Sequence, residues 1–395
     1  MSPAVGPTVR RIAPLIVLLV ASAALVLGRG AGRPAKGDEE VFVQAAYLMR
    51  TEHLDANHAV ARAARNEYAW VTPEVAARVR SKGDIQTYAL LHVWRHARDF
   101  HRSPSPWGSR LYVASRTLSQ VSELWFLATV FVLYWAALPL GRGVALASAL
   151  LLALGHPFRH GPLLFDPWVM PGAVAAIGLW LRDRHLATSA VAVAVTLVKP
   201  NYVFLLPAFL LAALVRPGRG DPEGRTSGTA ITAPIAGGAL VVVAYLALAA
   251  SHVIWLRGYE EGVRAGYNPA VLAYSLLETI SFTYRASSSG LRSHWPVYPW
   301  TLLSLGTLAL LAQRVVTRAR LPRTAVLLAA LVIVPVVADF MVIHTVAAYR
   351  AGGHFRWINV SIIAMAIALP VAYREAARAL AERTAPARQH ALVPS

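Results

Sequence analysis

The chain has 395 residues, of which 56% are hydrophobic and only 15% are charged, and its mean hydropathy is +0.48. This composition is too apolar for a soluble domain of that length and indicates an all-α polytopic membrane protein. The net charge of +18 would suggest a nucleic-acid partner for a soluble protein, but in a membrane protein the cations set topology and contact anionic headgroups. No cysteine is present, which excludes disulfides and thiolate metal sites.

The first apolar run, residues 12–28, follows Arg10 and Arg11, has no clean small-x-small cleavage site and is followed by many similar segments, so we interpret it as a retained signal anchor. A helix that crosses a bilayer needs about 20 apolar residues, and about ten stretches of the chain qualify or nearly qualify. Pro200 marks a break between the fifth and the sixth. The predicted membrane segments are 12–28, 122–140, 143–157, 166–181, 186–199, 201–215, 230–250, 297–313, 325–346 and 357–373.

The predicted organisation is one membrane domain, 1–395, with both termini in the cytoplasm. Short connections rich in arginine are assigned to the cytoplasmic side, whereas the short connections near 156–165 and 347–356 hold few cations. The parts of this domain are the first helix (12–28), an outside loop (29–121), helices two to seven (122–250), a second outside loop (251–296), helices eight to ten (297–373) and a cytoplasmic tail (374–395).

Both outside loops carry apolar patterns. Apolar residues recur at helical spacing over 41–49 and 56–63, which predicts amphipathic helices that lie in the membrane interface or simply cover the bundle. The second loop is rich in tyrosine and tryptophan, including Trp255, Tyr267 and Trp295. An aromatic belt at the headgroup level and a sugar-stacking surface both explain these residues.

The stretch Lys36–Arg50 places three carboxylates, Asp38, Glu39 and Glu40, directly after the first membrane segment. Asp38 is suited to be a helix N-cap, followed by two acids that complement the helix dipole. A partly desolvated carboxylate at a membrane exit also has a raised pKa, as a general base requires. The sequence leaves both interpretations open.

Other ionisable residues lie at or near the ends of predicted membrane segments. Asp166 precedes a proline and a tryptophan and is either a helix cap or a second catalytic carboxylate. Arg356 either snorkels to the interface or clamps a phosphate with its guanidinium fork. Lys199 closes the fifth segment on the outside, and Asp339 falls inside the ninth, where an ionisable residue is a functional candidate or pairs with a neighbouring cation.

The histidines form no recognisable metal signature. His92 and His96 are spaced i, i+4, but the glutamate of an HExxH motif is missing, so a zinc hydrolase is disfavoured. No glycine-rich phosphate loop and no GxSxG elbow occurs.

The order of these features resembles the GT-C class of integral membrane glycosyltransferases. The acidic motif after the first membrane helix is GDEEVFVQAAYLMR. A Leu/Trp-rich helix and an Arg-Leu-Ser-like turn follow, in TYALLHVWRHA and SRLYVASRTLSQVSELWFLATVFVLY. The third similarity is an acid before a membrane hairpin that ends in a lysine, from FDPWVMPGAVAAIGLWLRDR to TLVKPNYVFLLP. The last is an Arg-aromatic pair that opens a late helix, in HFRWINVSIIAMAIALP. The sequence predicts no C-terminal soluble domain of the kind that larger members of this class carry.

This resemblance implies an enzyme that moves a hexose or pentose from a polyprenyl-phosphate carrier to a glycan, lipid or protein acceptor of the cell envelope. The active site would lie on the outer face of the cell membrane, and the sugar carbon would be inverted. The implied catalytic residues are Asp38 as general base, with Glu39 as its nearest substitute, and Asp166. The implied substrate-binding residues are Arg356, Lys199, His354 and Arg116.

No cofactor is implied with certainty, and a divalent cation held by Asp38 and Asp166 is an open alternative. The expected partners are the polyprenyl-phosphate-linked sugar, the lipid bilayer and the acceptor, and nucleic acid is not among them. The alternative function is a transporter or flippase of a lipid-linked glycan, which would place polar groups along a midplane path. A membrane acyltransferase would need a histidine base, and the pair His92 and His96 is the only feature of the sequence that supports one.

Overall fold

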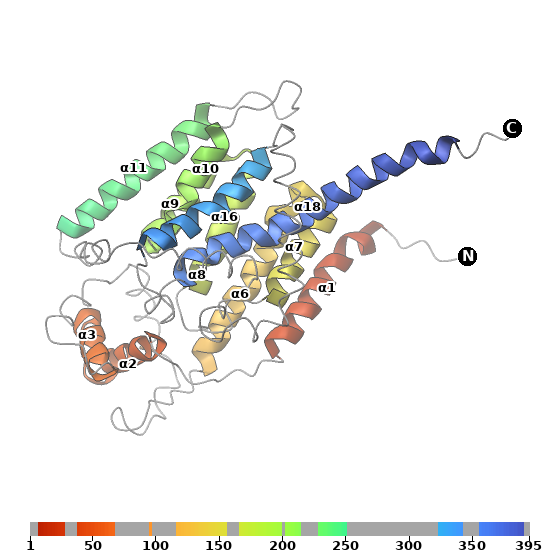
Figure 1. The fold of residues 1–395 in the computed structure, drawn as a ribbon. Helices are drawn as coiled ribbons and strands as arrows, with labels where there is room; N and C mark the ends of the chain where they lie inside the picture. Colours follow the sequence, from red (N-terminus) through yellow and green to blue (C-terminus); the bar gives the residue numbers. More distant parts are fainter. Residues whose placement is uncertain are drawn as a thin grey trace.

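The structure is a computed structural model, and its described residues form helices and turns without a strand (Figure 1), which confirms the all-α class. The described residues are 7–27, 38–67, 95–96, 116–155, 166–199, 202–214, 228–250, 323–342 and 355–390. The helices are α1 (Pro7–Leu27), α2 (Asp38–Thr51), α3 (Ala56–Glu67), α6 (Arg116–Ala137), the 3-10 helix η3 (Leu138–Leu140), α7 (Arg142–Gly155), α8 (Asp166–Trp180), α9 (His185–Val198), α10 (Leu205–Leu214), α11 (Gly228–Ala250), α16 (Arg323–Val342) and α18 (Phe355–His390).

Nine of the ten predicted apolar segments coincide with helices, and the remaining one, 297–313, lies outside the described residues. The largest difference concerns α18, which continues to His390, whereas the predicted segment ends at residue 373. Residues 374–390 are rich in alanine, arginine and glutamate, which are favourable helix formers without being apolar. Hydropathy therefore marks only the first half of this helix.

By length and composition, one helix in the described part of the chain could cross a membrane. It is α11, whose stretch Gly228–Ala247 has 20 residues and a mean hydropathy of 2.0, with 28% of it buried inside the protein. The number of membrane crossings stays a prediction. Shorter apolar helical stretches, of 10–17 residues, are Ile12–Ser22, Leu124–Leu140, Arg142–Ala153, Trp168–Trp180, His185–Val198, Leu205–Leu214 and Arg323–Pro335.

Arg182, in the turn between α8 and α9, joins the ends of two helices. Its guanidinium donates to the carbonyl oxygen of Gly178 in α8 at 2.7 Å, and to those of Trp135 and Ala136 in α6 at 2.5 Å and 3.4 Å. It also lies 4.0 Å from the centroid of the Trp135 ring. The carbonyl groups that a helix leaves unpaired at its C-terminus thus receive a charged donor. Because one side chain reaches both helix ends, α6 and α8 run parallel and end at the same level.

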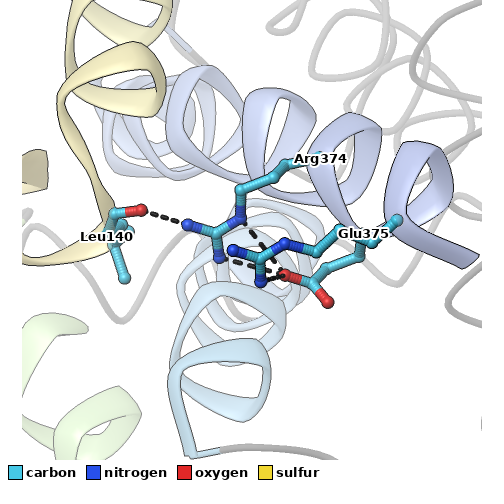
Figure 2. A network of polar contacts seen from close by, with 4 residues as sticks. Leu140, Arg374 and Glu375 are labelled. Carbon is cyan, nitrogen blue, oxygen red and sulfur yellow. Dashed lines mark hydrogen bonds and ion pairs between the residues drawn. The ribbon is translucent and has the colours of Figure 1, made fainter. Parts of the chain in front are cut away.

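Arg374 brings α18 to the same end of the bundle. Its guanidinium donates to the carbonyl oxygen of Leu140 in η3 and pairs with Glu375 at 3.0 Å (Figure 2). Arg378, one turn further along α18, pairs with the same carboxylate at 3.4 Å. Gly141, between η3 and α7, has a φ of 111°, which glycine adopts without strain.

We call this part of the molecule the arginine end. It contains the starts of α7, α9 and α16 together with the middle of α18. Arg323, which begins α16, lies within electrostatic range of His185, which begins α9. The arginines of this end are Arg142, Arg182, Arg184, Arg323, Arg374 and Arg378.

The opposite end of the bundle, which we call the site end, contains the starts of α6, α8 and α18 and the end of α9. Trp125 of α6 and Trp168 of α8 have ring centroids 5.6 Å apart near the start of α8. A Cβ atom on Gly172 of α8 would lie 2.6 Å from Val195 of α9, so these two antiparallel helices are in close contact near this end. The hydroxyl of Tyr245 in α11 donates to the carbonyl of Thr196 at 2.9 Å.

Helix α11 runs in the same direction as α9. A Cβ atom on its Gly237 would lie 3.0 Å from Val193, and Tyr245 is two turns further along beside Thr196. Helix α11 therefore begins at the arginine end and finishes at the site end. Helix directions thus alternate along the chain from α6 to α11, as they do in a bundle whose neighbours are joined by short connections (Figure 1).

The interior is apolar and rich in alanine, while several helices also expose large apolar side chains. Tyr202, Phe209 and Ile177 are fully buried in the core. On the outer surfaces, Val20 of α1 is 62% exposed and Val243 of α11 is 60% exposed, each among other exposed apolar residues of its helix. Several exposed apolar side chains on one helix are unusual for a soluble monomer, which agrees with a membrane-associated protein.

Helices α2 and α3 form a hairpin. Asp55 accepts a hydrogen bond from the backbone N–H of His58 at 3.0 Å and so caps the start of α3. Arg62 of α3 pairs with Glu52 at the end of α2. Residues 41–49 and 56–63 are helical as predicted, but described apolar side chains such as Leu48 and Val60 are buried within the protein. The apolar face that was expected to meet the membrane interface thus packs against protein.

Candidate active site

Asp38 and Glu39 are the first two residues of α2, in agreement with the predicted helix start. An acidic residue in the first turn of a helix is stabilised by the helix dipole, so the backbone position of Asp38 agrees with its interpretation as a helix cap. The side chains of both residues lie outside the described part, so neither interpretation of Asp38 is excluded. Figure 1 shows α2 and α3 on the side of the bundle where α6, α8 and α18 begin.

Asp166 and Lys199 lie at two helix ends that meet at the site end. Asp166 begins α8, six residues before Gly172, and Lys199 follows α9, four residues after Val195. At a rise of about 1.5 Å per residue, the backbones of Asp166 and Lys199 are about 9 Å and about 6 Å from the contact of these two helices. The structure therefore brings both positions to one end of the bundle, although the Asp166 side chain lies outside the described part.

Lys199 is buried, with only 3% of its surface exposed. Its backbone is extended, with a φ of −140° and a ψ of 108°, and its N–H donates to the carbonyl of Val195 at 2.9 Å. Its own carbonyl accepts a hydrogen bond from the N–H of Tyr202 at 3.1 Å. A lysine at the end of an apolar helix ordinarily extends toward water, so the burial of Lys199 sets it apart as an ionisable side chain held within the protein.

Arg356 is the second residue of α18, and Asp339 lies three residues before the end of α16. Ser361 of α18 donates to the carbonyl of Val332 in α16 at 3.0 Å. Since α16 begins at the arginine end and α18 runs toward that end, the two helices are antiparallel. Arg356 precedes Ser361 by about 8 Å of helix, and Asp339 follows Val332 by about 10 Å. Both backbones therefore lie toward the site end.

Asp339 lies near the end of the described part of α16, which extends to Val342. The predicted segment continues to residue 346, and residues 343–346 lie outside the described part, so the depth of Asp339 in that segment stays a prediction. Its side chain, like that of Arg356, lies outside the described part.

Arg116 begins α6, and His354 lies outside the described residues, just before α18. Because α6 runs parallel to α8, Arg116 is at the same end of the bundle as Asp166. The described side chains contain no group of three His, Asp or Glu residues that could hold a metal ion. The proposed cation ligands, Asp38 and Asp166, have side chains beyond that part, so the divalent-cation alternative stays a prediction.

An aromatic pair beside Asp166 was not assigned a role from the sequence. Trp168 is two residues after Asp166, and Trp125, which it contacts, is 39% exposed. The indole N–H of Trp168 is buried and has no hydrogen-bond partner among the described residues. Aromatic faces beside a free N–H donor suit a sugar, which presents C–H groups and hydroxyls together. In the sequence, the position of Trp168 two residues after Asp166 is the signal that could have pointed to this pair. The contact of Trp168 with Trp125 is visible only in the folded structure.

The arginine end is electrostatically different from the site end. Partial burial lowers the pKa of the Arg182 guanidinium from its usual value, but an arginine side chain keeps its charge in proteins. This charge is held against the carbonyl oxygens at the C-termini of α6 and α8, which carry the negative end of the helix dipole. The arrangement explains a structural role for Arg182 and offers no reactive group.

Within the described part of the chain, the fold is all-helical, one helix is long and apolar enough to span a membrane, and ionisable residues lie at the ends of several helices. Comparison of the chain with protein-family models, with curated proteins and with solved structures finds no match.

Proposed function

We propose that the protein is a polytopic membrane glycosyltransferase of the GT-C class, which transfers a sugar from a polyprenyl-phosphate carrier to an acceptor of the cell envelope. The observation that carries this proposal is the meeting of separate helix ends at the site end. Asp166, Lys199 and Arg356 come from three different helices, and their backbones lie at one end of the bundle. A reaction site between a lipid and a soluble acceptor needs such groups at a membrane surface rather than at its midplane.

The proposed topology has ten membrane helices with both termini in the cytoplasm and the site end on the outer face. Helix α11 ends at the site end and α16 begins at the arginine end, so one further crossing between them is needed. The predicted segment 297–313 would supply that crossing in the required direction. The arginines at the opposite end support the orientation because short arginine-rich connections favour the cytoplasmic side.

In the proposed reaction, the acceptor hydroxyl attacks the anomeric carbon while the bond from that carbon to the phosphate oxygen breaks. Asp38 takes the hydroxyl proton, and the departing polyprenyl phosphate keeps the electron pair of the broken bond. Arg356 and Lys199 stabilise the negative charge that develops on the phosphate. Asp166 positions the acceptor, and attack opposite to the leaving group inverts the sugar carbon.

The transporter alternative needs polar groups near the middle of the membrane. Asp339 is the deepest ionisable residue predicted from the sequence, and its side chain lies outside the described part. The described charged side chains of the bundle gather at its two ends rather than midway, which supports the enzyme over the transporter.

The direct test is transfer of radiolabelled sugar from polyprenyl phosphate. Membranes that contain the protein are expected to move label from the polyprenyl-phosphate donor into an acceptor, whereas matched membranes without the protein leave the label on the donor. Mass spectrometry of envelope glycans from cells with and without the protein then identifies the acceptor. Equal transfer in both membranes, across hexose and pentose donors, would contradict the proposal.

The topology can be tested separately because the chain has no cysteine. A Cβ atom on Gly143 or Gly228, both at the arginine end, would meet no atom within 4 Å, so Gly143→Cys and Gly228→Cys should fold. Thr51 at the end of α2 is exposed. On intact cells a membrane-impermeant maleimide is expected to label Thr51→Cys at once, and the two glycine variants only after permeabilisation. Labelling of all three from outside would exclude the proposed orientation.

A further inference from the structure

The arginine end concentrates positive charge on one surface of the bundle. Its described side chains include six arginines, whereas the nearby described acids are Asp183 and Glu375. Glu375 is already engaged by Arg374 and Arg378, and Asp183 lies 3.8 Å from His185. The acids therefore neutralise only part of this surface, and the remaining charge is positive.

Four of the six arginines fall into two groups. Arg182 and Arg374 are half-buried and hold helix ends together through backbone carbonyl oxygens. Arg142 and Arg184, in contrast, are exposed at the starts of α7 and α9. These exposed guanidinium groups can bind phosphate without disturbing the fold, because the fork of an arginine matches the oxygens of a phosphate.

Exposed aromatic and apolar residues lie beside these arginines. Tyr373 directly precedes Arg374 and is 70% exposed, and Trp135, under Arg182, is 37% exposed. Leu186, two residues after Arg184, is 67% exposed. Tyrosine and tryptophan collect at the headgroup level of membranes, where the ring is apolar and its polar edge meets water. A surface for nucleic acid or a soluble anion has no need of an exposed leucine next to its arginines.

We propose that the arginine end is a docking surface for anionic phospholipid headgroups, with Arg142 and Arg184 as its principal phosphate contacts. The apolar neighbours of these arginines enter the acyl region while the guanidinium groups reach the phosphates. This interaction is independent of sugar transfer, since it lies at the end of the bundle opposite to the candidate site. It would anchor the starts of α7 and α9 and thereby stabilise the bundle.

The test uses the full-length chain purified in a neutral detergent, with thermal unfolding followed as lipid is added. Phosphatidylglycerol is expected to raise the unfolding temperature by about 5 °C at saturation, because a ligand that binds only the folded state stabilises it. Phosphatidylcholine at the same concentration should raise it much less. In the double variant Arg142→Gln, Arg184→Gln, most of the shift caused by phosphatidylglycerol should be lost.

The control is the double variant Arg50→Gln, Arg62→Gln, which removes the same charge from α2 and α3 and should keep the full shift. The unfolding temperature without lipid shows whether each variant folds. Equal shifts with the two lipids, or an unchanged shift in the Arg142→Gln, Arg184→Gln variant, would overturn the proposal. A larger shift with inorganic phosphate or with a short single-stranded DNA than with phosphatidylglycerol would also overturn it, in favour of a soluble anion or nucleic acid.

Discussion

Replacement of Asp38 by asparagine is expected to lower the rate of sugar transfer by about 10²- to 10⁴-fold, which is the contribution that a positioned general base makes. Asparagine has almost the same size as aspartate but cannot accept the proton of the acceptor hydroxyl. It is also a favourable residue at a helix N-terminus, so the start of α2 should persist. The measurement is transfer of labelled sugar from the polyprenyl-phosphate donor in membranes that contain equal amounts of each protein.

Glu40→Gln is the matched control for Asp38→Asn. Glu40 lies in the same first turn of α2 and would lose the same charge, yet it has no proposed role in the reaction. This variant should keep nearly full activity, whereas Glu39→Gln tests the nearest substitute for Asp38. Unchanged transfer by Asp38→Asn at normal protein levels would contradict the proposal that Asp38 is the general base. A loss of transfer confined to Glu39→Gln would instead indicate that Glu39 is the general base.

Substitution of Gly178 by alanine is expected to destabilise the protein by about 1–3 kcal/mol, the usual cost of extra volume in a packed core. A Cβ atom at this position would lie 2.6 Å from the Trp135 ring and 2.8 Å from the backbone Cα of Ala136. Neither neighbour can move aside easily, because Arg182 binds the carbonyl oxygens of Trp135 and Ala136. The expected result is a lower unfolding temperature of the purified protein.

Two further glycines in the same protein provide the comparison. A Cβ atom on Gly238 of α11 would meet no atom within 4 Å, so Gly238→Ala should be neutral or stabilise the helix by up to about 1 kcal/mol. On Gly172 the Cβ atom would lie 2.6 Å from a methyl group of Val195, the one close atom in the described part, so a side chain rather than the backbone would have to shift and an intermediate loss is expected. Equal stability of Gly178→Ala and Gly238→Ala would contradict the close contact of α6 with α8.

The same contact illustrates what periodicity cannot reveal. Helices α8, α11 and α16 are apolar on nearly every side, so their sequences do not show which face turns inward. Small residues such as Gly178 and Gly172 decide where two helices approach closely, and a glycine in an apolar helix has the same appearance whether it faces a neighbour or, like Gly238, open space.

The candidate site also has a part that the sequence predicts and a part that only the packing of the helices reveals. Asp38 and Asp166 are recognisable from the sequence because each acid begins a helix beside an apolar segment, and both helices start where predicted. The shared end of the bundle depends on the parallel alignment of α6 with α8 and the antiparallel pairing of α16 with α18. Those alignments arise from contacts such as Arg182 with Ala136 and Ser361 with Val332, between residues far apart in the chain.

By itself, the sequence determined the all-helical class, the positions of nine described helices and the acids that begin two of them, because length, hydropathy and capping are local properties. The burial of Lys199, the burial of the apolar faces of α2 and α3 and the pairing of α16 with α18 became evident only from the tertiary structure. The physical reason is that these properties depend on which helix lies beside which, and packing between apolar helices is selected by shape and by a few polar contacts rather than by composition.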